Sequence, residues 1–124
     1  MELVHVRLVV QDFGPMFRFY RDVVGLVPQV DDDRGPYGKL SFSGGAAIAL
    51  QTHAHVSASL GPLTVAGGER IILAIRVDDL DATKETLAAR GARFLVTPPV
   101  AWGRMRVAHV RDPEGNLVEL QQWQ

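Results

Sequence analysis

Alternating apolar and polar residues predict short strands along the chain. Residues 4–10 carry apolar side chains at every second position, at Val4, Val6, Leu8 and Val10. A period of two is typical of a strand with one buried face. The same criterion predicts further strands over residues 39–43, 46–51, 70–77, 93–96, 107–110 and 117–120.

Glycine and proline mark the reversals between these strands. Gly44-Gly45 separates one pair of strands, and Asp-Pro-Glu-Gly at 112–115 separates the last pair. Proline fixes φ, glycine accepts a positive φ, and aspartate can bond to the backbone two residues later. Both pairs are therefore predicted hairpins. Residues 98–103, with Pro98-Pro99 and Trp102, predict a loop.

Apolar residues at helical spacing predict two helices. The first follows Asp12, a predicted N-cap, and ends at Gly25. The second runs from about residue 82 to residue 90, with Asp81 as its predicted cap and Gly91 as its end.

Two segments carry no helix or clear strand pattern. Residues 27–36 contain three consecutive aspartates and predict an exposed connection or an edge strand. Residues 52–68 contain serine, glycine and proline, and we expect a linker or flexible loop there. His53 and His55 would then be solvated loop residues.

The two halves of the chain repeat one pattern. Residues 4–10 align with residues 71–77, and Asp12 aligns with Asp79. Gly45, Ala49 and Leu50 align with Gly115, Glu119 and Leu120. Each half is predicted as a strand, a helix and three strands, which makes an α+β fold of two βαβββ modules, about 1–55 and 69–124, with a linker at about 56–68. One half alone buries too little, so we expect 1–124 to form a single domain whose sheets curve around a cavity.

Composition excludes several function classes. The chain of 124 residues has 13 basic and 14 acidic residues and no cysteine, which rules out disulfides, thiolate metal sites and a cysteine nucleophile. Without a basic patch, nucleic acid is not an expected partner. The apolar runs are too short to span a bilayer, and the alternating start is unlike a signal peptide. We therefore expect a cytoplasmic protein without a membrane partner.

Polar residues on the predicted strands are the candidate site. Glu119 is an acid inside a strand, so it faces either water or a cavity. Arg7 and Arg76 share a face with His5, and they would either clamp a carboxylate or phosphate of a ligand or neutralise Glu119. The face of His109 depends on the hairpin register, which a one-residue slip would reverse.

Three stretches together resemble the vicinal oxygen chelate superfamily, which includes glyoxalase I, extradiol dioxygenases, and fosfomycin and bleomycin resistance proteins. These stretches are Val4-His5-Val6, the helix of residues 17–26, and Trp102-Gly103 ahead of residues 111–120. The resemblance covers essentially the whole chain and implies four metal-ligand positions in the cavity: His5, Ala49, Ile72 and Glu119.

Only two of these four positions carry ligand chemistry. Ala49 and Ile72 offer no donor, whereas a divalent ion needs at least three protein donors of the oxygen or nitrogen type. Gln51 shares strand parity with Ala49 and lies about 6 to 7 Å further along. His53 and His55 lie beyond it in the predicted loop. Any of these three residues could replace a lost ligand only after the chain rearranges. We therefore expect no metal cofactor, and a divalent metal with a substituted ligand set is the alternative.

The resulting hypothesis is a non-catalytic protein that sequesters a small organic molecule, aromatic or anionic, as resistance proteins of this family bind drugs. Its predicted ligand-binding residues are His5, Arg7, Gln51, Arg76, Trp102 and Glu119. Trp102 would stack on a flat ligand, anchor its loop or contact a dimer partner. The alternative is an enzyme, either a metal-dependent lyase or dioxygenase or a metal-free enzyme with Glu119 and His5 as base and acid. We expect a homodimer. Its modules would either pair within one chain or swap with those of the partner chain.

Overall fold

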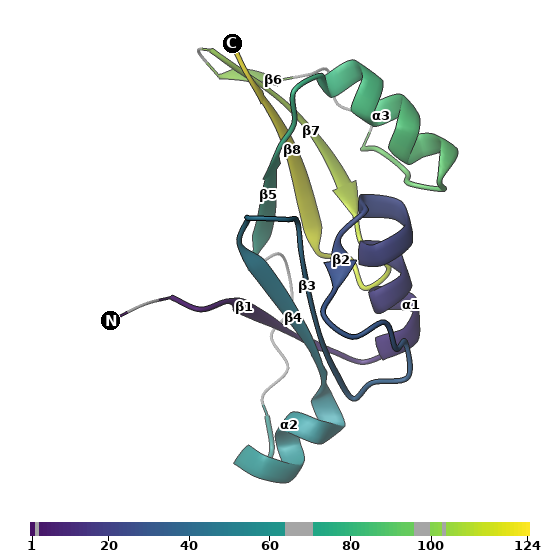
Figure 1. The fold of residues 1–124 in the computed structure, drawn as a ribbon, viewed down its shortest axis with the longest axis vertical. Coiled ribbons are helices and arrows are strands. Elements are labelled where there is room, and N and C mark those ends of the chain that lie inside the picture. Colours follow the sequence, from purple (N-terminus) through teal and green to yellow (C-terminus); the bar gives the residue numbers. More distant parts are fainter. Residues whose placement is uncertain (2, 64–70, 96–99, 103) are drawn as a thin grey trace. The chain divides into compact units, whose positions relative to one another are not determined.

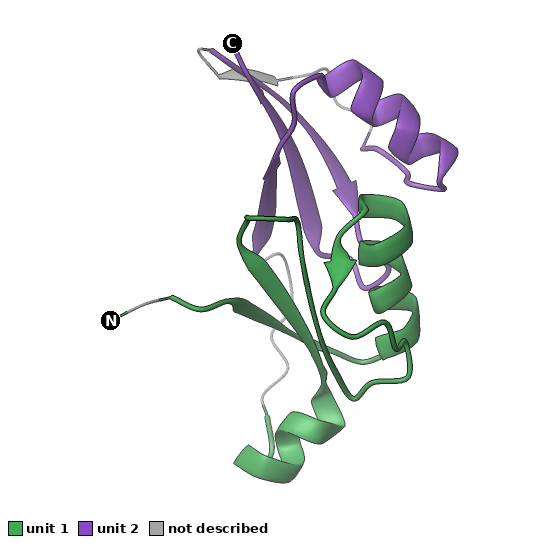
Figure 2. Ribbon diagram, in the orientation of Figure 1, with its two compact units in different colours: residues 1–66 green, residues 67–124 purple. Residues whose placement is uncertain are grey.

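The chain folds as two compact units, residues 1–66 and 67–124 (Figure 2). The structure is a computed structural model that describes residue 1 and residues 3–63, 71–95, 100–102 and 104–124. Each unit contains one βαβββ module, so the predicted α+β fold is confirmed.

Unit 1 is built on a sheet with the strand order β1-β4-β3-β2, called sheet A (Figure 1). β1 (Val6–Val10) runs parallel to β4 (Ala47–Thr52), and the pairs of β3 (Tyr37–Ser41) with β4 and with β2 (Val27–Pro28) are antiparallel. The helical segment after β1 is α1 (Phe13–Arg18) continued by the π-helical η1 (Phe19–Val24). Gly25 ends it with a φ of 91°, as the sequence predicts.

The core of unit 1 lies between this helical segment and one face of sheet A. Its least exposed apolar side chains are Leu8, Val10, Phe13, Met16, Phe17, Tyr20, Leu40 and Leu50. Gly38 allows the close approach of helix and sheet, because a Cβ atom there would lie 3.0 Å from the Phe13 ring. The opposite face, called the open face of sheet A, carries Arg7, Tyr37, Lys39, Ala49 and Gln51.

Unit 2 repeats this arrangement in sheet B, with the strand order β5-β8-β7-β6. Its elements are β5 (Ile72–Arg76), α3 (Leu80–Ala89), β6 (Val100–Trp102), β7 (Met105–Arg111) and β8 (Leu117–Trp123). Buried apolar residues of α3, β7 and β8 form its core: Leu80, Leu87, Ala108, Val110, Val118 and Leu120. The alternate positions form the open face of sheet B, with Ile72, Ala74, Arg76, His109, Glu119 and Gln121.

The turn between β7 and β8 is held by Asp112. This buried carboxylate accepts hydrogen bonds from the backbone N–H groups of Glu114 and Asn116. Gly115 has a φ of 89°, which only glycine adopts without strain. The hairpin predicted from this turn is confirmed.

Strand register confirms the predicted repeat. In sheet A, Arg7 of β1 lies beside Ala49 of β4, and in sheet B, Ala74 of β5 lies beside Glu119 of β8. These are the pairs that the sequence alignment of the two halves makes equivalent. Ile72 consequently shares the open face of sheet B with Glu119.

The predicted linker is wrong over its first part. Residues His53–Leu60 form helix α2, because the side chain of Thr52 caps it by accepting a hydrogen bond from the His55 backbone N–H. Gly61, with a φ of 84°, follows its last residue. His53 and His55 are therefore helix residues, not loop residues.

Unit 2 requires three smaller corrections. Asp79, not Asp81, caps α3, because the Asp79 carboxylate accepts the Ala82 N–H at 3.0 Å and the helix starts two residues earlier than predicted. The predicted strand at 93–96 is reduced to an isolated bridge at Phe94, and residue 96 lies outside the described residues. Trp102 belongs to the short strand β6 instead of a loop.

None of the helices in the described part of the chain is long and apolar enough to cross a membrane.

Candidate functional site

A buried carboxylate is the centre of a hydrogen-bond network on the open face of sheet B. Glu119 is 6% exposed and lies directly across from His109 in the β7–β8 pair. His109 Nε2 is 2.8 Å from Glu119 Oε2, and Gln121 Nε2 donates to Glu119 Oε1 at 2.7 Å. Both carboxylate oxygens are thus bonded inside unit 2, which offsets the cost of burying the charge.

Trp123 extends this network along β8. Its indole Nε1 donates to Gln121 Oε1 at 3.3 Å. Because an indole N–H can only donate, the Gln121 oxygen must face Trp123 and the Gln121 amide nitrogen must face Glu119. Trp123 therefore donates to Gln121, and Gln121 in turn donates to the carboxylate.

His109 is a half-buried member of this network with two ring nitrogens. Its side chain is 21% exposed, and Nε2 is used by Glu119. When Nε2 of a neutral ring donates to the carboxylate, the other ring nitrogen, Nδ1, carries no proton and can accept a hydrogen bond. The pair has the arrangement of an imidazole oriented by a carboxylate.

A second network lies on the open face of sheet A. Arg7 Nη1 donates to Gln51 Oε1 at 2.9 Å, and the guanidinium lies 5.6 Å from the centre of the Tyr37 ring. Gln51 Nε2 is 2.7 Å from Nδ1 of His55 on α2. Since arginine can only donate, it fixes the Gln51 oxygen toward itself and makes His55 Nδ1 the acceptor.

Two histidines of unit 1 carry unsatisfied buried atoms. His5 Nδ1 and His53 Nε2 have no hydrogen-bond partner among the described residues. The other ring nitrogen of His53 is 3.4 Å from the Ser57 hydroxyl, within α2. His5 lies two residues before Arg7, just outside β1, and its buried nitrogen is the kind of group that a ligand can satisfy.

The residues predicted from the sequence divide between the two units. Arg7 and Gln51 are brought into contact in unit 1. In unit 2, Arg76 pairs with Gln121 in the β5–β8 register and shares the open face with Glu119. The partner of Glu119 in this unit is His109, and the two predicted roles of Arg7 and Arg76, a ligand clamp or neutralisation of Glu119 by one of them, stay predictions. The side chain of Trp102 lies outside the described residues.

The implied metal-ligand positions do not fit a divalent ion. Ala49 and Ile72 carry only hydrocarbon side chains, so only His5 and Glu119 offer donor atoms at the four positions. Within the described residues, no three His, Asp or Glu side chains are grouped so that they could share an ion. We assign no metal-dependent step to these residues.

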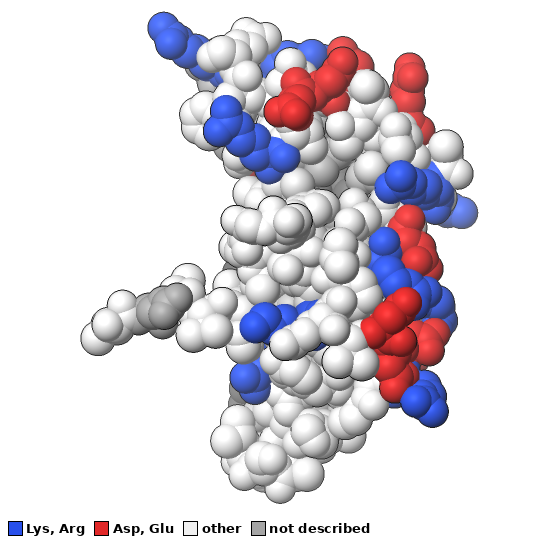
Figure 3. All heavy atoms as spheres, viewed as in Figure 1, with Lys and Arg blue, Asp and Glu red and all other residues white. Residues whose placement is uncertain are grey.

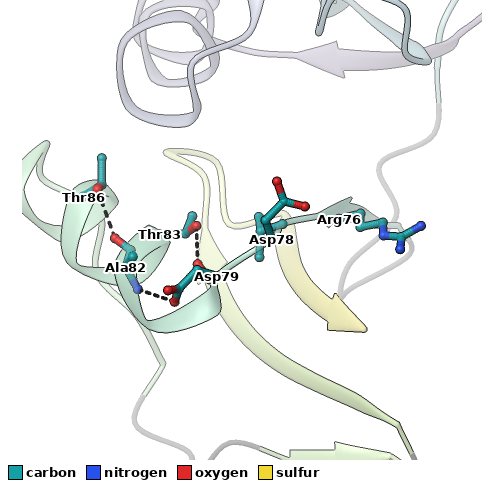
Figure 4. A pocket seen from close by; sticks show the side chains of 7 residues that line it. Arg76, Asp78, Asp79, Ala82, Thr83 and Thr86 are labelled. Atoms are coloured by element: carbon teal, nitrogen blue, oxygen red, sulfur yellow. Dashed lines mark hydrogen bonds between the residues drawn. The ribbon is translucent and has the colours of Figure 1, made fainter. Parts of the chain in front are cut away.

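A surface hollow of about 450 Å³ lies beside the start of α3 (Figure 4). Its polar groups bond to one another: the Asp79 carboxylate accepts from Ala82 N, and the Thr83 hydroxyl donates to the Asp79 carbonyl. Arg76 points away from the helix start in Figure 4. These contacts are those of a capped helix, and we assign no ligand to the hollow.

Sequence reasoning missed His109 and Gln121 as partners of Glu119, and Trp123 as the partner of Gln121. Alternation along β8 does place residues 119, 121 and 123 on one face, so Gln121 and Trp123 had a usable signal. His109 joins them only through the β7–β8 register, which the pattern of a single strand does not fix.

Comparison with known proteins agrees with this fold. A protein named YraH from Bacillus subtilis is 30% identical over 97% of both chains. A probable lactoylglutathione lyase from Vibrio cholerae is 29% identical over 95% of this chain and 88% of its own length.

Solved structures show the same architecture. A glyoxalase/bleomycin resistance protein/dioxygenase family enzyme from Burkholderia phytofirmans matches with a TM-score of 0.81 at 23% identity, over 100% of both chains. TnmS3, an antibiotic binding protein from a Streptomyces species, matches with a TM-score of 0.71 at 24% identity, over 100% of this chain and 99% of its own. The family model of the Glyoxalase/Bleomycin resistance protein/Dioxygenase superfamily matches residues 2–120, and the chain belongs to that superfamily.

Proposed function

We propose that this protein binds a small organic molecule on the open faces of its sheets without transforming it. The observation that carries the proposal is the state of Glu119. Its two oxygens accept hydrogen bonds from His109 and Gln121, so this carboxylate has a role in the network of unit 2 that requires no metal ion. Two of the four positions that metal enzymes of the superfamily use are Ala49 and Ile72, which have no donor atoms.

The likeness to TnmS3, an antibiotic binding protein, supports sequestration as the role. A chain that binds a toxic molecule stoichiometrically protects a cell without turnover, and we expect this in the cytoplasm as a homodimer. Ligand contacts would come from the Arg7 guanidinium on sheet A, or from His109 Nδ1 on sheet B, and stacking on Trp102 stays a prediction from the sequence.

Calorimetry and a turnover assay on the same purified protein test this proposal. Bleomycin and a panel of planar aromatic antibiotics serve as probes. We expect one of them to bind with a fixed stoichiometry and to be recovered unchanged. Lactoylglutathione lyase activity, assayed with added Ni²⁺, Zn²⁺, Mn²⁺ or Fe²⁺, should stay at the level of protein-free solution. Turnover that Glu119→Gln abolishes would overturn the proposal.

A metal-free acid–base enzyme is the second candidate, and one contact favours it. The 2.8 Å pair of His109 Nε2 and Glu119 Oε2 would let Glu119 orient the imidazole while Nδ1 moves a proton on a substrate. The sequence suggested His5 and Glu119 as the acid and base, which belong to different units. His109→Gln should abolish turnover in this case and leave binding within about tenfold, because only proton transfer is lost.

A further inference from the structure

The central positions of the two sheets carry opposite chemistry. Ala49 in β4 and Glu119 in β8 occupy the same register position, each between a first and a third strand of its module. Glu119 is flanked by Ala74 and His109, whereas Ala49 is flanked by Arg7 and Lys39. Module 1 therefore has two cations around a position where module 2 has the carboxylate itself.

No salt bridge joins a described acid of unit 1 to either of these two cations. The salt bridges found among its described residues join Arg18 to Asp33, Arg21 to Asp22 and Asp31, and Arg34 to Asp32. They lie on α1, η1 and the loop that follows, where Figure 3 shows acidic and basic atoms side by side. Arg7 and Lys39 form no ion pair with any described residue, and the contacts of Arg7 are to the neutral Gln51 and Tyr37.

We propose that the open face of sheet A binds the carboxylate of an organic anion between the side chains of Arg7 and Lys39, which flank the buried Ala49. This inference rests on the proposed function and names the chemical class of its ligand. Adjacent strands lie about 4.8 Å apart, so the two flanking backbones are separated by roughly 10 Å, a gap that an arginine and a lysine side chain can span around one shared anion. A planar carboxylate suits the arginine fork.

The residues around Arg7 and Lys39 favour the binding of such a carboxylate. Gln51 and Tyr37 hold the Arg7 side chain in place, which reduces the entropy lost on binding. Arg7 is exposed and Lys39 is half-buried, so both charged ends can be reached. A hollow of about 410 Å³ continues from Lys39 along β2 and β3, lined also by Val27, Gln29, Ser41 and Ser43, and it would receive the rest of the molecule.

Benzoate and its neutral analogue benzamide are the probes that test this site. In an NMR titration, benzoate should shift the Arg7 and Lys39 side-chain signals, and benzamide should shift them far less. Arg7→Met and Lys39→Met should each weaken benzoate binding by roughly tenfold or more, because each removes one charge-assisted contact. Arg34→Met, which removes an exposed cation paired with Asp32, is the matched control and should bind benzoate like the wild type.

Ala49→Glu provides a complementary test. It recreates the Glu119 position in module 1, and the new carboxylate should occupy the site and abolish benzoate binding. Ala49→Gln has nearly the same size without the charge and should keep more of the binding. If Ala49→Glu does not fold, the Arg7→Met/Lys39→Met double variant gives the same information, since it should not bind benzoate at all.

Three results would overturn the carboxylate site. They are equal binding of benzamide and benzoate, benzoate binding that survives in the double variant, and equal loss of benzoate binding in Arg34→Met. Preference for inorganic phosphate over benzoate would also overturn it. After any of these results, stoichiometric binding of a neutral molecule would leave the proposed function standing. If none of them occurs, turnover of a bound carboxylate would overturn the proposed function and leave this site intact.

Discussion

Gln51 and Gln121 occupy the same register position in the two modules and perform the same task. Each lies two residues beyond the central position of its sheet, next to Val9 and Arg76 respectively. Each side-chain oxygen accepts from a group that can only donate, Arg7 or Trp123, and each amide nitrogen is thereby turned toward a histidine or a carboxylate. The repeat thus preserves the orienting amide while the groups around it differ.

The contact between His109 and Glu119 should be measurable as stability. We expect His109→Ala to lower the free energy of unfolding by about 1–3 kcal/mol, because a buried carboxylate loses one of its two hydrogen-bond donors. Urea denaturation at neutral pH gives this value. Glu119→Ala in the His109→Ala background should cost less than Glu119→Ala alone, since the partner is already absent.

Additive effects in that double-mutant cycle would show that the two side chains do not interact. His5→Ala provides a comparison for loss of an imidazole, because the buried Nδ1 of His5 has no partner among the described residues. His5→Ala should therefore destabilise the protein less than His109→Ala.

Helix α3 should depend on Asp79 more than on Asp81. Asp79→Ala removes the acceptor of the Ala82 N–H and should lower the free energy of unfolding by about 1 kcal/mol. Asp81→Ala removes only an exposed salt bridge with Arg106 and should cost less than about 1 kcal/mol. Thermal or urea denaturation of the two variants compares them directly, and a larger loss in Asp81→Ala would contradict the observed cap.

The position of this cap illustrates what the sequence could predict. Alternation and helical spacing predict the βαβββ order of both modules. Gly44-Gly45 and Gly115 mark the hairpin turns, and Asp12 aligns with Asp79. Asp79 and Asp81 are both acids ahead of an apolar run. Which of them becomes the N-cap depends on the backbone conformation after β5. A local pattern cannot distinguish them, because either carboxylate can cap a helix.

The candidate site was only partly predictable for a related reason. Faces within one strand follow from alternation, which predicts that Arg7, Gln51 and Glu119 each lie on the face of their strand opposite the helices. Partners on a neighbouring strand require the register, which is why His109 was left open. Helix α2 was missed because its propensity is weak, and Thr52 and Gly61, its cap and its end, were interpreted as loop residues.

The ion pair of Asp32 and Arg34 should give a measurable acid titration. The Arg34 side chain, and then its backbone N–H, donate to Asp32 and lower the pKa of that carboxyl from 3.8 to about 2. A folded-state pKa below the unfolded value stabilises the folded chain above pH 3.8, and this contribution is lost as the pH falls toward about 2. Carboxyl-carbon NMR should show this midpoint. In Arg34→Met, the midpoint should move back toward 3.8, whereas Arg21→Met should leave it unchanged.

Adding a donor side chain at one of the four metal-ligand positions tests whether the missing donors at Ala49 and Ile72 limit metal affinity. Ile72 is 52% exposed on the open face of sheet B, the face that carries Glu119. Ile72→His adds a nitrogen donor there, and we expect it to bind Zn²⁺ or Ni²⁺ at least tenfold more tightly than the wild type, because two donors in one unit replace one. Ile72→Gln is the control of similar size without an imidazole, and Glu119→Gln in the Ile72→His background should remove the gain. Calorimetry measures the affinities after dialysis against a chelator, which should leave the melting temperature of the wild-type protein unchanged. A wild-type protein that retains one metal ion per chain through dialysis would mean that other side chains complete the site, and the loss of Ala49 and Ile72 as ligands would then no longer argue against metal-dependent activity.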